Sequence, residues 1–109
     1  MSDETNEDPD LVSIEAKFEN AKADRLIAKH RWDSAKGKLH MTLVARREAG
    51  EKLTIEDMKA IKDSAIDNDP DVRETYLMFI SADSEYRAAK VKFDDATRRY
   101  WDSKPLKFK

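Results

Sequence analysis

The chain has 109 residues, of which 40% are charged and only two are glycine, and its formal net charge is −2. This length fits one domain, and a composition so rich in charge and poor in glycine is typical of long helices with solvated outer faces, so sheets are not expected. The absence of cysteine excludes disulfides and thiolate metal sites, and no apolar run approaches the roughly 18 residues that cross a bilayer, so we expect a cytoplasmic protein.

Two long helices begin with the same signal. Residues 1–8 are acidic and polar, and we expect them to form a disordered tail. The sequence Asp-Pro-Asp then occurs at 8–10 and again at 69–71. Aspartate caps free backbone amides, proline suits the first helical position, and a second acid favours the positive end of the helix dipole. We therefore predict helices over about 9–49 and 70–103.

Each long helix carries a stripe in which bulky residues and alanine alternate at spacings of three and four. In the first helix the stripe comprises Leu11, Ile14, Phe18, Ala21, Arg25, Ala28, Trp32, Ala35 and Leu39. In the second it comprises Val72, Thr75, Phe79, Ala82, Tyr86, Ala89, Phe93, Ala96 and Tyr100, each 61 positions after its counterpart, by chance or by an old duplication. Alanine once per heptad predicts a coiled-coil seam between closely packed antiparallel helices. This seam would place Trp32 in the core, and Arg25, the odd member of its stripe, could lie outward with its stem covering apolar surface.

A short helix is expected between the two long ones. Gly50 is a natural left-handed cap after the first helix, and Thr54 caps a helix over about 55–67 whose first turn is acidic. Pro105 ends the last helix and leaves residues 105–109 as a basic tail. The sequence therefore predicts an all-α antiparallel hairpin that forms one domain over residues 9–104.

No motif for catalysis or cofactor binding is recognisable. The chain lacks a glycine-rich phosphate loop and a nameable nucleophile motif. His30 and His40 are ten residues apart, so they lie about 80° from each other around a helix and about 15 Å along it, which rules out an i, i+4 metal pair. The aspartates at 67, 69 and 71 are better explained as helix caps than as metal ligands. We therefore expect no enzyme, no cofactor and no metal site.

Positive charge gathers along the first helix. Between residues 25 and 47, seven lysines and arginines accompany one acidic residue, Asp33, which gives a local charge near +6. Such a stretch is either a solvated helix face or a contact for nucleic-acid phosphates, and such contacts would not read sequence. The candidate DNA-contacting residues lie toward the end of this stretch and just beyond it: Lys36, Lys38, Arg46, Arg47 and Lys52.

The order of these features resembles the recombination mediator (UvsY) family of T-even-type bacteriophages. Two segments carry the resemblance: Leu43–Gly50 at the basic end of the first helix and Asp67–Val72 at the start of the last. The similarity is one of organisation, over about residues 11–103. It implies a ring-like homo-oligomer that binds single-stranded DNA and loads a recombinase onto strands occupied by single-strand binding protein. The family's basic DNA-contacting cluster would fall on Arg46 and Arg47.

The first hypothesis is therefore a sequence-nonspecific single-stranded DNA-binding protein that acts as a recombination mediator. The alternative is a helical protein-interaction module, such as a phage-encoded adaptor or inhibitor of a host protein, without nucleic-acid binding. We also expect a homo-oligomer, because the chain has more apolar residues than two helices can cover. Those residues are Leu26, Ile27, Leu43, Val44, Leu77, Ile80 and Trp101.

Overall fold

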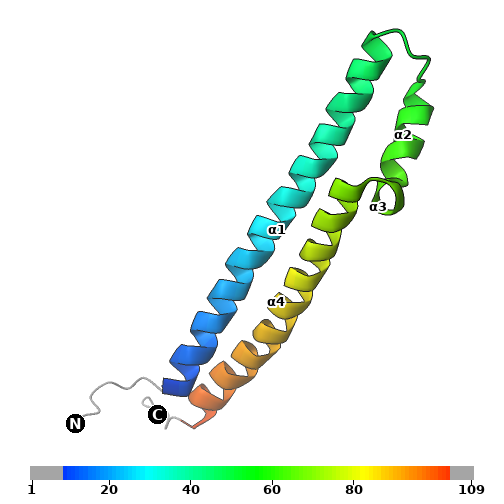
Figure 1. Ribbon diagram of the computed structural model, residues 1–109. Helices are drawn as coiled ribbons and strands as arrows, with labels where there is room; N and C mark the ends of the chain where they lie inside the picture. Colours follow the sequence, from blue (N-terminus) through cyan, green and yellow to red (C-terminus); the bar gives the residue numbers. More distant parts are fainter. Residues whose placement is uncertain (1–8, 104–109) are drawn as a thin grey trace, which may run out of the picture.

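The computed structural model describes residues 9–103 as an extended helical hairpin with extents of 74 × 27 × 20 Å. Helix α1 spans Pro9–Glu48, α2 spans Ile55–Asp63, α3 spans Ala65–Asn68 and α4 spans Pro70–Asp102. Helices α1 and α4 pack antiparallel, so the described chain begins and ends at the same end of the hairpin (Figure 1). The predicted all-α antiparallel hairpin is confirmed. The expected tails over 1–8 and 105–109, and the cap at Asp8, lie outside the described residues.

The start of α4 has the capping geometry that its sequence predicts. Oδ1 of Asp69 accepts hydrogen bonds from the backbone amides of Asp71, at 3.0 Å, and Val72, at 3.1 Å. Pro70 occupies the first turn, where its missing amide hydrogen leaves no bond unmade. At the other end of the connection, Gly50 has a φ of 103°, a left-handed conformation that side chains with a Cβ rarely adopt. These two devices fix where α1 ends and α4 begins.

The expectation of one helix over 55–67 is wrong, because the segment is divided at Ser64 into α2 and α3. Thr54 does cap α2: its Oγ1 accepts from the amide of Asp57, whose carboxylate accepts in return from the Thr54 amide, both at 3.0 Å. At the break, Oγ of Ser64 donates to the carbonyl of Ile61 at 3.2 Å. Serine competes with regular helical bonding in this way, so the chain turns here.

The best-buried cluster lies where the short helices meet the two long ones. Ala35, Ala65 and Val72 are buried there, with Trp32, Leu39 and Ile66 packed around them. Figure 1 shows α2 running beside the part of α1 that extends beyond α4. Leu43, one of the apolar residues that the two long helices cannot all cover, is instead covered by α2, which packs against α1, and it is 0% exposed. Val44 is half-buried.

The seam between α1 and α4 has two different faces. On one, which we call the aromatic face, the ring of Phe18 stacks against those of Tyr86 and Phe93, at centroid distances of 5.6 and 4.9 Å, and Trp32 stacks on Phe79 at 5.4 Å. On the other, which we call the alanine face, shallow grooves run between the helices. The alanine face is formed by Ala21, Ala28, Ala35, Ala82, Ala89 and Ala96.

Candidate nucleic-acid interface

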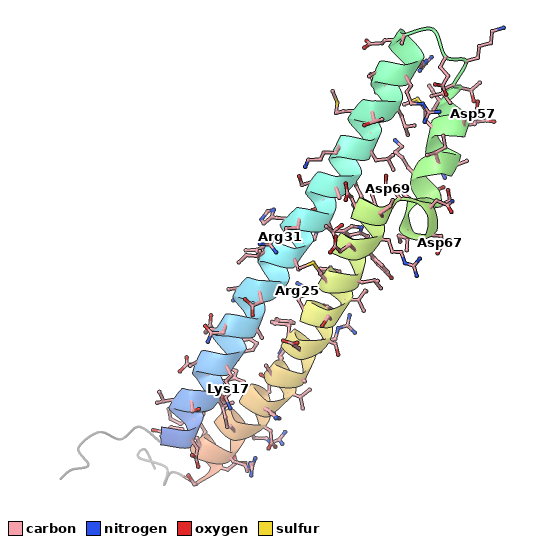
Figure 2. All side chains as sticks on the ribbon, viewed as in Figure 1. Lys17, Arg25, Arg31, Asp57, Asp67 and Asp69 are labelled. Carbon is pink, nitrogen blue, oxygen red and sulfur yellow. The ribbon has the colours of Figure 1, made fainter. Side chains whose placement is uncertain are left out.

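Arg25 is the one charged member of the two stripes, and it faces α4. Its Nε donates to Oδ1 of Asp83 at 2.6 Å, while Nε of Arg87 approaches the other carboxylate oxygen at 2.8 Å. The expectation that Arg25 lies outward is therefore wrong, and Figure 2 shows its label between the two long helices. The guanidinium also lies 5.5 Å from the ring centroid of Phe79 and 5.2 Å from that of Tyr86. Its hydrogen bond to Asp83 lowers the pKa of that carboxyl.

Three lysines form a row along α1 on the aromatic face. Lys22, Lys29 and Lys36 each follow a stripe residue by four positions, so they lie beside it on the helix surface, and all three are exposed. They are one heptad apart, which gives a row about 21 Å long. Nζ of Lys36 lies 4.0 Å from the centroid of the Trp32 ring, a cation–π contact. Within the row, the Lys36 ammonium group thus lies against the half-buried Trp32 ring, and Lys22 lies one turn from the half-buried Phe18.

Asp33 is the acidic neighbour of this lysine row. Its two carboxylate oxygens lie 3.2 Å from Nζ of Lys29 and 3.3 Å from Nζ of Lys36. The hydrogen bond from Lys29 is the main reason that the pKa of Asp33 is lowered. Pairs this exposed contribute little to stability, because water screens them. A phosphate could therefore take over both lysines without disrupting the fold.

The candidate cations Arg46, Arg47 and Lys52 lie at the tip where α1 ends. Arg46 holds the carboxylate of Glu51 through two nitrogens, with Nε 2.9 Å from Oε1, and this hydrogen bond lowers the pKa of Glu51. Arg47 and Lys52 are exposed and make no ion pair within residues 9–103. Arg47 and Lys52 are therefore available to bind a phosphate, whereas Arg46 is held by Glu51.

The remaining candidates, Lys36 and Lys38, lie on opposite sides of α1. Two residues along a helix turn the side chain by about 200°, so the lysines cannot share a surface. Lys36 lies on the aromatic face, whereas Lys38 borders a groove of the alanine face that Asp71 and Glu74 of α4 also line. The basic density seen in the linear sequence is thus divided among the tip and both faces.

Charge differs between the two faces of the seam. On each long helix, rows of residues spaced seven apart run beside the aromatic face. Together with Arg25, these rows hold seven basic and five acidic side chains. The basic ones are Lys22, Arg25, Lys29, Lys36, Arg73, Arg87 and Lys90, and the acidic ones are Glu15, Glu19, Asp33, Asp83 and Asp94. The rows that flank the alanine face reverse this ratio. Their acidic side chains are Asp10, Asp24, Asp71, Glu74, Glu85, Asp95 and Asp102, against Lys17, Arg31, Lys38, Lys92 and Arg99.

Linear charge density pointed to Lys36 but missed Lys22 and the basic partners of the row on α4. Lys22 lies outside the dense basic stretch, and Arg87 and Lys90 belong to the other helix. The signal that could have found the row is the heptad pattern itself, because counting four residues on from Phe18, Arg25 and Trp32 gives Lys22, Lys29 and Lys36 in turn. These charges share a surface because of their positions around the helix, and not because they are close along the chain.

No protein-family model, curated protein or solved structure matches this chain. Among the described helices, none is long and apolar enough to cross a membrane. Within residues 9–103 the histidines and carboxylates also form no group of three that could hold a metal ion. The charges, rings and surfaces of the hairpin are therefore the features that indicate its function.

Proposed function

We propose that this chain is a non-enzymatic protein that binds single-stranded DNA without sequence preference, through the aromatic face of its hairpin. The observation that carries the proposal is the row of Lys22, Lys29 and Lys36 beside the half-buried rings of the seam. Proteins that hold single strands combine a cationic track for the backbone with aromatic surfaces for the bases. The row supplies the first of these features, and the edges of Trp32 and Phe18 supply the second.

The opposite charge of the two faces gives a strand one preferred side. Phosphates approaching the aromatic face meet an excess of basic groups and release counterions from the DNA, whereas the alanine face carries an excess of carboxylates that repel them. At the tip, Arg47 and Lys52 extend the positive surface beyond Pro70, where α4 begins. No side chain here is arranged to read base edges, so affinity should depend on salt and hardly on sequence.

The test is a titration of a fluorescently labelled single strand, followed by anisotropy at two salt concentrations. The variant Lys22→Gln/Lys36→Gln removes two charges from the aromatic face, and Lys38→Gln/Lys92→Gln removes two from the alanine face as a matched control. A single-stranded contact contributes a slope of about −0.7 in log K against log salt. The first variant should therefore flatten the slope by roughly 1.4 relative to the native chain, while the control should leave it unchanged.

Two results would contradict the proposal. One is the absence of binding at low salt, and the other is an equal loss of affinity in both double variants. A third variant, Arg47→Gln/Lys52→Gln, tests the tip separately. If the tip alone carries binding, the interface lies where the linear sequence predicts it and the aromatic face has no part in it.

A helical protein-interaction module is the second candidate, and one observation favours it. The outer surface of α4 has a shallow groove lined by Pro70, Leu77 and Met78, and both Leu77 and Met78 are exposed. Apolar side chains gathered in this way on a charged helix are typical of a contact with another protein. In that case labelled DNA would not bind at low salt, and the tagged chain would retain a specific partner from nuclease-treated lysate that the variant Leu77→Lys loses.

The resemblance to recombination mediators adds a further role to the first candidate, namely loading a recombinase onto strands covered by single-strand binding protein. That role requires simultaneous contacts with DNA and with protein. A strand-exchange assay with a recombinase and its single-strand binding protein would test it directly. If the chain binds DNA but does not accelerate strand exchange, the mediator role is excluded while the binding proposal stands.

A further inference from the structure

Helix α1 has a second stripe, on the side that faces away from α4. Starting at Ser13, the residues at alternating spacings of three and four carry no charged side chain along nearly the whole helix. They are Ser13, Ala16, Asn20, Ala23, Ile27, His30, Ser34, Gly37, Met41 and Val44. At 100° per residue this stripe lies about 160° from the seam, so α4 cannot cover it.

The outer stripe is exposed in the hairpin. Ile27 is 50% and Met41 64% exposed, and only Val44 at the far end is half-buried. The outer face of a surface helix normally carries most of its charge, and in this chain the charged residues of α1 lie on the rows beside the stripe instead. A heptad repeat of small and apolar residues is the pattern by which one helix packs on another.

A row of charges runs along one edge of the outer stripe. It comprises Asp10, Lys17, Asp24, Arg31 and Lys38, one heptad apart, and the signs of the first four alternate. Lys17, Asp24 and Arg31 make no ion pair with any of the residues that the structure describes. A row that reads minus, plus, minus, plus is complementary to itself when it is reversed, because each charge then faces the opposite sign.

We infer that the outer stripe binds α1 of a second copy of this chain in antiparallel orientation. In coiled-coil geometry the pairing of the charged rows fixes the register: Lys17 faces Asp24 of the second copy, and Asp10 faces Arg31 of the second copy. The same register sets Ala16 opposite Ile27 of the second copy and Asn20 opposite Ala23 of the second copy. Each bulky residue thus meets a small one, as close packing requires.

Registers shifted by one heptad are unfavourable because they bring like charges together. A shift of one heptad in one direction places Lys17 opposite Arg31 and brings the two copies of Asp24 together, which outweighs the favourable pairing of Asp10 with Lys38. A shift in the other direction brings the two copies of Lys17 together and places Asp10 opposite Asp24. Like charges in these positions are unfavourable, so of these three registers the first is favoured. It overlaps residues 10–31 of both copies, about 33 Å of helix.

Sedimentation of the full chain over a range of concentrations tests this dimer. We expect the native chain to dimerise. Lys17 faces Asp24 of the second copy at two equivalent places, so Lys17→Glu should raise the dissociation constant of the dimer roughly tenfold or more. The double variant Lys17→Asp/Asp24→Lys keeps the row self-complementary and should restore it. Lys22→Glu makes the same charge change on another side of α1 and should leave association unchanged.

Orientation is measured with a spin label at a single cysteine, Met41→Cys, in a chain that has no other cysteine. The antiparallel register centres between Asn20 and Ala23, so the two labels should be roughly 60 Å apart, whereas a parallel pair would hold them on the order of 10 Å apart. A short label distance overturns the inference, as does a monomer at 100 µM or a dimer that Lys17→Glu does not weaken. None of these outcomes depends on DNA binding.

Discussion

Replacing Leu43 with alanine should destabilise the hairpin far more than the same change at Leu26. Both leucines lie on α1, and both are among the apolar residues that two helices cannot all cover. In the structure Leu43 is 0% exposed where α2 packs against α1, whereas Leu26 is 55% exposed. Removing a buried leucine side chain costs about 2–5 kcal/mol, from the lost transfer free energy and the cavity that remains. An exposed position of this kind changes stability by within about 0.5 kcal/mol.

The magnitude matters because a chain of this size has a free energy of unfolding of only about 5–15 kcal/mol. A loss of about 3 kcal/mol would lower the melting temperature by roughly 12–24 °C. The assay is urea unfolding followed by circular dichroism at 222 nm, at one fixed chain concentration because self-association shifts apparent stability. Leu43→Met, which nearly conserves volume, should cost less than about 1.5 kcal/mol. Equal effects at the two leucines would refute the packing of α2 against α1.

Three further predictions use the same unfolding assay. The two glycines should respond in opposite directions to alanine: Gly37, in the middle of α1 with open space around it, should gain up to about 1 kcal/mol, and Gly50, with its φ of 103°, should lose about 1–2 kcal/mol. Thr54→Ala removes the side-chain oxygen that caps α2 and should cost about 1 kcal/mol. The hydrogen bond from Arg25 lowers the pKa of Asp83, so its stabilising contribution is complete above about pH 4 and is lost as the pH falls through the folded pKa. The urea midpoint should fall in that acidic range, and it should fall less in Asp83→Asn.

The two long helices could be predicted because every local signal agrees. The Asp69-Pro70-Asp71 cap, the alanine stripe and the turn at Gly50 each point to the same hairpin, and the structure has all of them. The break at Ser64 could not be predicted in this way. The residues around it suit a helix, and the division depends on a single hydroxyl that bonds to the carbonyl of Ile61 and on the packing of α3 against α4.

The candidate interface was harder to predict because charge was counted along the chain rather than around the helix. Arg25 looked like an interruption of an apolar stripe, and its partner Asp83 lies 58 residues away on α4. Only the register of the two helices brings that pair together. Lys36 and Lys38 are close in sequence, yet they point to opposite faces because of the helical period. Antiparallel pairing and helical phase thus decide which charges share a surface.

The antiparallel dimer and the DNA-binding face are compatible in space. The lysine row lies about 130° around α1 from the outer stripe, so a second copy does not cover it. An antiparallel pair is related by a two-fold axis perpendicular to both helices, and this rotation leaves a row on the same side of the pair. The two copies of Lys22, Lys29 and Lys36 would therefore lie on one side of the dimer, and the acidic alanine faces on the other.

This arrangement predicts that dimerisation acts on long strands and not on short ones. An oligonucleotide that covers one lysine row gains nothing from the second copy, so Lys17→Glu should bind it as the native chain does. A strand long enough to cross both rows binds the second one at a high effective concentration, and Lys17→Glu should lose that gain, on the order of tenfold or more. Anisotropy titrations with the two lengths measure both affinities. If Lys17→Glu weakens short and long strands equally, Lys17 contacts DNA itself and the two surfaces are not separate.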